Sequence, residues 1–135
     1  MLIEPKELSL EEMRFIAKKS NNFYSVAELS ALQKTNLFIF SEDFGFVRIE
    51  NPRNNNFAWV HGSFWGSGVF RYFNVFKDIE FLIKNYFNVG HVLCQIPLNC
   101  ESLHRLLFRI GFHVDFNYQR FADDNTLVYS KHIGG

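Results

Sequence analysis

A strand, a glycine-containing loop and a helix follow one another in the middle of the chain, and this order constrains the fold most. Residues 57–64 have a pattern typical of a β-strand, and Trp65-Gly66-Ser67-Gly68 follows directly. Apolar residues at three- and four-residue spacing then predict a helix: Tyr72, Phe76, Ile79, Ile83 and Tyr86. Gly90 ends this helix, and residues 92–96 read as a short buried strand. Two strands joined through a helix predict a parallel, right-handed crossover.

Helix caps and turn residues predict the elements before this unit. Ser9 and Glu12 have the spacing of a capping box, which predicts a helix over about 9–19, and Ser25 repeats the device before a second short helix. Residues 37–40 and 44–50 read as a hairpin, and a run of turn formers separates them from the third strand.

The elements after the crossover are a helix and a second hairpin. Asn99 or Cys100 opens the helix, and Gly111 closes it. Apolar and polar residues alternate over 112–119, and a turn leads into a last strand over 126–131. We therefore expect one domain over 1–135, with N-terminal helices in 1–33 and a sheet in 34–131.

Composition narrows the classes of partner and compartment. The chain has 135 residues, 47% of them apolar, which is enough for one core. Lys plus Arg and Asp plus Glu are both 14, so the net charge is zero and nucleic acid is not an expected partner. Apolar runs such as residues 36–40 are far shorter than the roughly 18 residues of a membrane span, so no membrane partner is expected. Without a basic segment and apolar stretch at its start, the chain is expected to stay in the cytoplasm, where Cys94 and Cys100 would be free thiols.

Phenylalanine is unusually frequent, with 17 residues. Most of this aromatic mass is expected to fill the core. The alternative is an exposed aromatic patch used for docking or self-association.

The order of elements, together with Ile96-Pro97-Leu98-Asn99 ahead of a helix that ends in Gly111-Phe112, resembles the GNAT family of N-acetyltransferases. The similarity covers roughly residues 34–131. It implies an α/β fold of the GNAT (acyl-CoA N-acyltransferase) type. Its sheet would be mixed and mostly antiparallel, with a central parallel β-α-β unit and helices on both faces.

The resemblance also implies a site for acetyl-CoA or CoA. In the family, loop amides at a helix N-terminus hold the cofactor pyrophosphate, as unsatisfied N–H groups and the helix dipole favour an anion. The loop positions that match in this chain are Gly66, Ser67, Gly68, Val69, Phe70 and Arg71. Asn99, at the start of the later helix, is a further cofactor-binding position that the resemblance implies. Trp65 replaces the family's basic or amide residue, and Phe70 stands where Gly or Ala is usual. Read without the resemblance, the two glycines also suit an ordinary tight turn between a strand and a helix.

The catalytic groups that the resemblance implies are largely replaced. Leu106 or Leu107 stands where many GNAT enzymes carry a Tyr that protonates the leaving thiolate. The strand 57–64 lacks the carboxylate that often acts as general base, and His61 is its only titratable residue. His61 is therefore the candidate base, because imidazole titrates near neutral pH, and its alternative role is structural.

Other chemistries have weaker support. The five histidines show no pair at i, i+4, so we expect no metal site. Cys100 lies near a helix start but lacks the partners of a nucleophile. His104, with Arg105 and Arg109, reads as a basic stripe on a solvated helix face.

Within the GNAT fold, the sequence as a whole, including Val60-His61-Gly62 and the Asp-containing terminal hairpin, most resembles small GNAT-like proteins of tailed phages. Notable among these are head-assembly accessory proteins of short-tailed lambdoid phages. This resemblance implies a phage accessory protein for head or virion assembly, with a degenerate acyl-CoA site. It would act in the host cytoplasm on phage structural or ejected virion proteins, or as a homo-oligomer. Two alternatives remain open: an active N-acetyltransferase that uses acetyl-CoA on an unknown amine, and a domain that binds CoA without catalysis.

Overall fold

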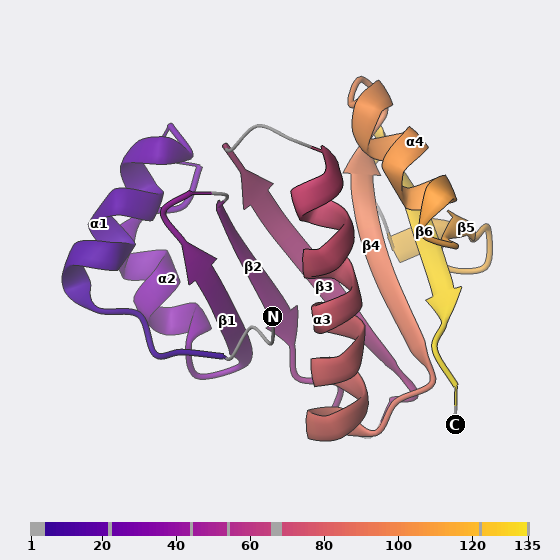
Figure 1. Ribbon diagram of the computed structural model, residues 1–135, viewed down its shortest axis with the longest axis horizontal. Helices are drawn as coiled ribbons and strands as arrows, with labels where there is room; N and C mark the ends of the chain where they lie inside the picture. The colour runs from indigo at the N-terminus through magenta and orange to yellow at the C-terminus, as the bar shows by residue number, and fades with distance from the viewer. Residues whose placement is uncertain are drawn as a thin grey trace.

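The computed structural model describes residues 5–21, 23–43, 45–53, 55–65, 69–121 and 123–134, with side chains described except at 69–75 and 121. The elements follow the predicted order (Figure 1). They are α1 Leu10–Lys19, α2 Val26–Leu32, β1 Asn36–Ser41, β2 Gly45–Glu50, β3 Phe57–Phe64, α3 Val69–Phe87, β4 His91–Pro97, α4 Glu101–Arg109, β5 His113–Val114, a 3-10 turn Gln119–Phe121, and β6 Thr126–His132.

The six strands form one sheet in the order β1-β2-β3-β4-β6-β5. Strands β3 and β4 pair in parallel, and every other pair is antiparallel. The parallel pair lies at the centre, and α3 connects its two strands. This confirms the predicted mixed, mostly antiparallel sheet with a central β-α-β unit.

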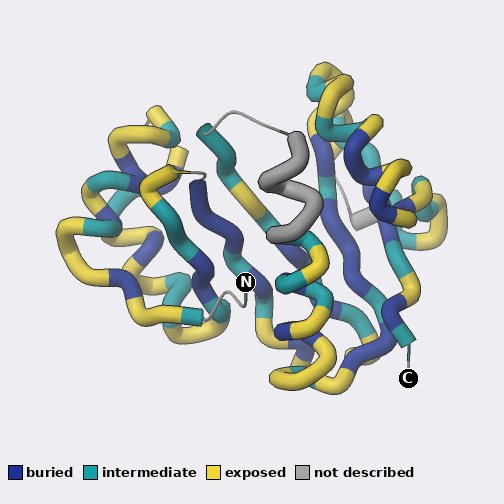
Figure 2. The backbone as a smooth tube through the Cα atoms, viewed as in Figure 1, coloured by how far each residue is buried: buried dark blue, intermediate teal, exposed yellow. Residues whose placement is uncertain are grey.

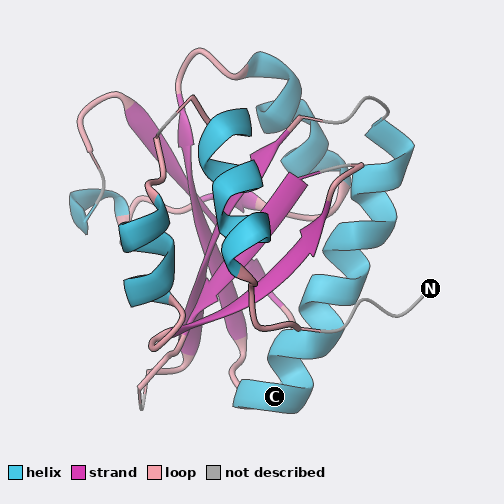
Figure 3. Cartoon of the chain, turned by 90° about the vertical axis from the view of Figure 1, so that its left-hand side faces the viewer, coloured by secondary structure: helices cyan, strands magenta, loops and turns pink. Residues whose placement is uncertain are grey.

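Helices cover both faces of the sheet (Figure 3). Ile16 of α1 and Leu29 of α2 pack with Phe38 and Phe46, which are all fully or almost fully buried. The neighbouring strand residues point to the opposite face, where Ile39, Val47 and Ala58 pack with the following residues of α3 and α4: Ile79, Ile83, Leu106 and Leu107. Buried backbone accordingly runs along the strands, and the outer sides of the helices are exposed (Figure 2).

The predicted caps of the first two helices are present. The Ser9 hydroxyl accepts a hydrogen bond from the Glu12 amide at 3.2 Å, and the Glu12 carboxylate accepts one from the Ser9 amide at 2.9 Å. The Ser25 hydroxyl accepts from the Glu28 amide at 3.1 Å. Each cap satisfies backbone donors that a helix start leaves unpaired.

His104 faces inward, not toward solvent as the basic stripe predicted. Its Nε2 lies 2.8 Å from the Pro97 carbonyl oxygen, and its Nδ1 lies 2.6 Å from the Tyr129 hydroxyl. Because a carbonyl can only accept, Nε2 carries the proton and Nδ1 accepts from Tyr129. The imidazole thus joins α4 to the end of β4 and to β6.

The second hairpin is shorter than the alternation over 112–119 predicted. Only His113 and Val114 pair with β6, and Phe116 is 79% exposed. The Asp115 carboxylate accepts from the Asn117 amide at 3.0 Å and from the Ser130 hydroxyl at 2.8 Å. The first bond closes a local turn after β5, and the second keeps Asp115 against β6.

The phenylalanines divide between core and surface, and a docking role for the exposed ones stays a prediction. Phe38, Phe46 and Phe112 are buried, whereas Phe23 and Phe116 are more than three-quarters exposed. None of the helices in the described part of the chain is long and apolar enough to cross a membrane.

Candidate active site

The two central strands separate along their length. Register pairs between β3 and β4 run only from Phe57–His91 to Trp59–Leu93, although β3 continues to Phe64 and β4 to Pro97. Figure 1 shows the strands diverging toward their carboxyl ends, beside the beginning of α3.

A cavity of about 600 Å³ opens beside this separation. Its walls include His61 and Phe64 of β3, Cys94 of β4, Phe76 of α3 and Leu107 of α4. The Phe64 and Phe76 ring centroids are 6.2 Å apart. A largely apolar cavity of this size, with a few polar groups, is typical of a small-molecule site.

Gln95 and Asp123 form a polar part of the same cavity. The Gln95 side-chain amide donates to the Asp123 carboxylate at 3.0 Å. This bond links β4 to the segment that precedes β6, and it places an amide and a carboxylate beside the apolar wall.

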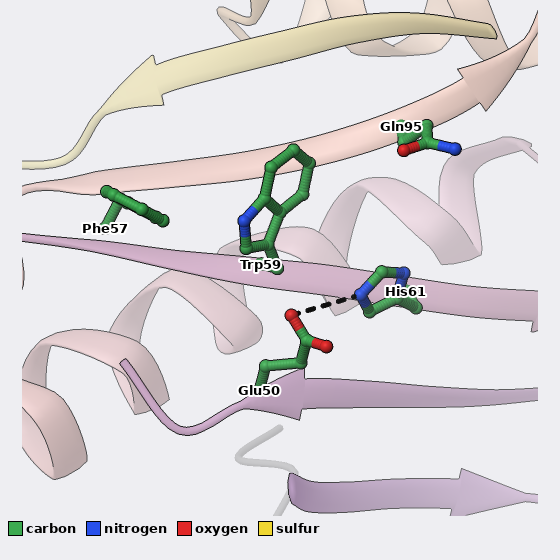
Figure 4. Close-up of a pocket in the computed structure, with 5 residues that line it drawn as sticks. All are labelled: Glu50, Phe57, Trp59, His61 and Gln95. Atoms are coloured by element: carbon green, nitrogen blue, oxygen red, sulfur yellow. Dashed lines mark ion pairs between the residues drawn. The ribbon is translucent and has the colours of Figure 1, made fainter. Parts of the chain in front are cut away.

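The predicted base, His61, lies beside a carboxylate from the neighbouring strand. His61 Nε2 is 3.5 Å from Oε2 of Glu50, which is within ion-pair distance (Figure 4). Arg48 Nη1 lies 3.6 Å from the other carboxylate oxygen. The pKa of Glu50 is therefore below its ordinary value, chiefly through the His61 interaction and also through the Arg48 charge, against the opposing effect of burial. Glu50 is thus an anion at neutral pH.

His61 Nε2 is buried and makes no hydrogen bond within the described residues. The contact with Glu50 meets the distance of an ion pair but lacks the alignment of a hydrogen bond. A buried polar nitrogen without a hydrogen bond costs free energy, and a ligand that supplies one would recover it.

Arg48 has a supporting role next to this pair. Its guanidinium donates to the Tyr24 hydroxyl at 3.3 Å and to the Asn36 side-chain oxygen at 3.0 Å. These bonds fix the arginine, which in turn fixes the carboxylate of Glu50.

Among the other predicted site residues, Asn99 is the one whose side chain is described. Gly66, Ser67 and Gly68 lie outside the described residues. Val69, Phe70 and Arg71 form the first turn of α3, and their side chains also lie outside the description. Asn99 is exposed in the turn before α4 and does not line the cavity.

Trp65, at the loop position where the resemblance implies a basic or amide residue, is held away from the cavity. Its indole N–H donates to the Glu42 carbonyl at 2.8 Å, and its ring meets Phe15 edge-on at 5.7 Å. Trp65 therefore ties the end of β3 to α1 and to the β1–β2 turn.

Leu106 and Leu107, at the position of the implied tyrosine acid, are buried in the core. Tyr129 of β6 uses its hydroxyl to bond His104. Of the two, only Leu107 lines the cavity.

Sequence reasoning missed Glu50, because it searched for the carboxylate on the strand that carries His61. The signal was present in the hairpin register. Arg48 pairs with His61 across β2 and β3, so Glu50, two residues further along the same face, is a diagonal neighbour of His61.

The structure also bears on the two alternative chemistries, a metal site and a thiol nucleophile. Within the described ranges, no group of three or more His, Cys, Asp or Glu residues could hold a metal ion. Cys100 precedes α4 without a capping hydrogen bond, and its thiol lies 3.7 Å from the Asn99 side-chain oxygen.

Comparisons with known proteins identify the fold. No family model matches the sequence, and no curated protein matches it. Among solved structures, a dodecameric spermidine N-acetyltransferase from Vibrio cholerae aligns with a TM-score of 0.73 and 12% identity, over 97% of this chain and 94% of that one. The Campylobacter jejuni N-acetyltransferase PseH in complex with acetyl coenzyme A aligns at 0.72 and 15% identity, over 97% and 99%. The chain therefore has the fold of the GNAT N-acetyltransferases.

Proposed function

We propose that the protein transfers an acyl group from an acyl-CoA, most simply acetyl-CoA, to an amine. The observation that carries this proposal is the ion pair of His61 with Glu50, in which His61 lines the cavity beside the separated strands. The fold and the acetyl coenzyme A complex of a protein with the same fold support it. Glu50 provides the carboxylate that the sequence of β3 lacks.

The chain's own residues would contribute binding and proton transfer. An acyl-CoA supplies a thioester, whose carbonyl carbon is attacked by the amine nitrogen while the C–S bond breaks. His61 would take the proton that the amine loses on the ring nitrogen that does not face Glu50, and Glu50 would stabilise the imidazolium through Nε2. Because leucines stand in place of the acid, the departing thiolate would take its proton from water.

Two measurements test this proposal. Acetyl-CoA should raise the melting temperature, because a ligand at 100 times its Kd stabilises a fold by about 2.7 kcal/mol. His61→Ala should keep this shift and lose acetyl transfer to a mixture of amines. His113→Ala, an exposed histidine on β5 outside the cavity, is the matched control and should keep both. If millimolar acetyl-CoA produced no shift in melting temperature and no acetyl transfer, the enzyme would be excluded.

A second candidate function is the phage accessory role in head or virion assembly, with a degenerate acyl-CoA site. Leu106 and Leu107 at the place of the implied acid favour it, as do the exposed Phe23 and Phe116, because aromatic residues often anchor protein interfaces. The partners would be phage structural or ejected virion proteins in the host cytoplasm, or further copies of the chain. One protein of the same fold is dodecameric.

A phage carrying His61→Ala should be compared with one carrying Phe23→Ser and Phe116→Ser, after both proteins are shown to be folded. Loss of infectious particles only in the aromatic variant would support assembly by contact. Loss only in the His61 variant would support the enzyme. Binding of CoA without transfer by the wild-type protein would favour a domain that binds CoA without catalysis.

A further inference from the structure

A second pocket lies directly beside His61 on the sheet face opposite to α3 and α4. It has a volume of about 320 Å³ and is lined by Glu50, Phe57, Trp59, His61 and Gln95 (Figure 4). Side chains alternate between the two faces of β3. Ala58 and Val60 point into the core with α3 and α4, so the opposite face carries Phe57, Trp59 and His61. Helices α1 and α2 lie on this side of the sheet, where they pack on β1 and β2.

Two residues, His61 and Gln95, line both this pocket and the larger cavity. The imidazole therefore stands at the junction of the two spaces. A molecule in the small pocket and an acyl group in the large cavity would meet at His61.

The walls of the small pocket are aromatic. Trp59 stacks on His61, with ring centroids 6.4 Å apart and planes 18° from parallel. Phe57 is held edge-on by Tyr118 at 5.3 Å. Aromatic faces in such a pocket attract the flat or short apolar body of a ligand and also attract cations.

The formal charge that lines this pocket is negative. Glu50 is the carboxylate, its side chain is 42% exposed, and its lowered pKa keeps it ionised at neutral pH. Arg48 reaches the far oxygen of Glu50, but its side chain is only 13% exposed and its other bonds go to Tyr24 and Asn36. The oxygen that faces His61 remains beside the pocket.

We propose that this pocket binds the acceptor as an organic monocation, a primary ammonium on an aromatic or short apolar body. The ammonium would lie by the Glu50 carboxylate, and the apolar body would lie against Trp59 and Phe57. An acceptor with a carboxylate near its amine would be repelled by Glu50. The role of the bound cation as the acyl acceptor rests on the proposed function. Binding of the cation itself does not depend on acyl transfer.

Intrinsic fluorescence can report binding at this pocket alone. The chain has two tryptophans, and Trp65 packs away from the pocket against Phe15. Trp65→Phe therefore leaves Trp59 as the only indole. The probes are benzylammonium, benzyl alcohol and benzoate, which share one ring and differ in charge, and no acyl-CoA is present.

Benzylammonium should change the Trp59 emission saturably and bind at least about 10-fold more tightly than benzyl alcohol, with benzoate weaker still. Glu50→Gln in the same background should remove most of this preference. Glu11→Gln, on the exposed side of α1, is the matched control and should keep it. Circular dichroism shows whether each variant remains folded.

Equal binding of benzylammonium and benzyl alcohol, or a preference that survives Glu50→Gln, would overturn the ammonium pocket. The two proposals fail separately. A Glu50-dependent cation preference without acetyl transfer would retain the pocket and remove the enzyme. Transfer without that preference would retain the enzyme and remove this substrate class.

Discussion

Replacing Tyr129 by Phe tests whether one hydroxyl holds α4 against β6. Tyr129 is 1% exposed, and its ring contacts Phe108 and His104, which a Phe ring would preserve. The change therefore removes one hydrogen bond and leaves His104 Nδ1 without its donor. His104 cannot compensate by turning, because its Nε2 is bonded to the Pro97 carbonyl.

The expected loss of unfolding free energy follows from this geometry. An unsatisfied buried acceptor costs about 1–3 kcal/mol, and His104 is only half-buried, so we expect about 1–2 kcal/mol. Urea unfolding followed by circular dichroism measures the loss, provided that the slope with urea is unchanged. Tyr86→Phe, at a tyrosine that is 59% exposed, is the control and should change stability by less than about 0.5 kcal/mol. If Tyr129→Phe cost no more than this control, the assigned bond would not contribute to stability.

Three further predictions concern the core, the charged pair and the thiols. Ile83→Ala should cost about 2–5 kcal/mol in urea unfolding, because Ile83 is fully buried between α3 and the sheet; a loss under about 1 kcal/mol would remove it from the core. The lowered pKa of Glu50 means that its contribution to stability is present above pH 4.5 and is lost as the pH falls through the folded value. Glu50→Gln should therefore destabilise the protein at pH 7, and its difference in stability from the wild type should shrink as the pH falls below 4.5; a difference that grows in acid would contradict the lowered pKa. Burial raises the pKa of Cys94 to about 12, so at pH 8 a thiol reagent should modify the partly exposed Cys100 and spare Cys94 until the protein is unfolded; equal rates would contradict the burial.

The fold was largely predictable because its strongest signals are local. Capping serines, helical spacing in α3 and the glycine loop each depend on neighbours in the sequence, and together they leave few topologies. The second hairpin was predicted too long, because alternation over 112–119 cannot reveal that the Asp115 carboxylate bonds the next turn. The Asn117 contact is local, whereas the bonds of Asp115 to Ser130 and of the Gln119 side chain to β6 require the folded structure.

The candidate site was predictable only in part. His61 was selected because it is the single titratable residue on β3, and the structure places it in the lining of the cavity; its role as a base stays a prediction. Glu50 and the aromatic pocket depend on which residues face each other across strands, and this requires the register. The predicted loop contacts of Gly66, Ser67 and Gly68 remain predictions.

The short pairing between β3 and β4 also affects how the chain folds and where the sheet opens first. Strands β1, β2 and β3 are joined by adjacent hairpins, and β4 pairs with β6 along seven residues, whereas the two halves share three register pairs. The loop that closes when β3 meets β4 includes the whole of α3, so this step carries a larger entropic cost than a hairpin. Amide protons at this central seam should therefore exchange with solvent faster than those between β4 and β6, so that the middle of the sheet opens before its C-terminal half.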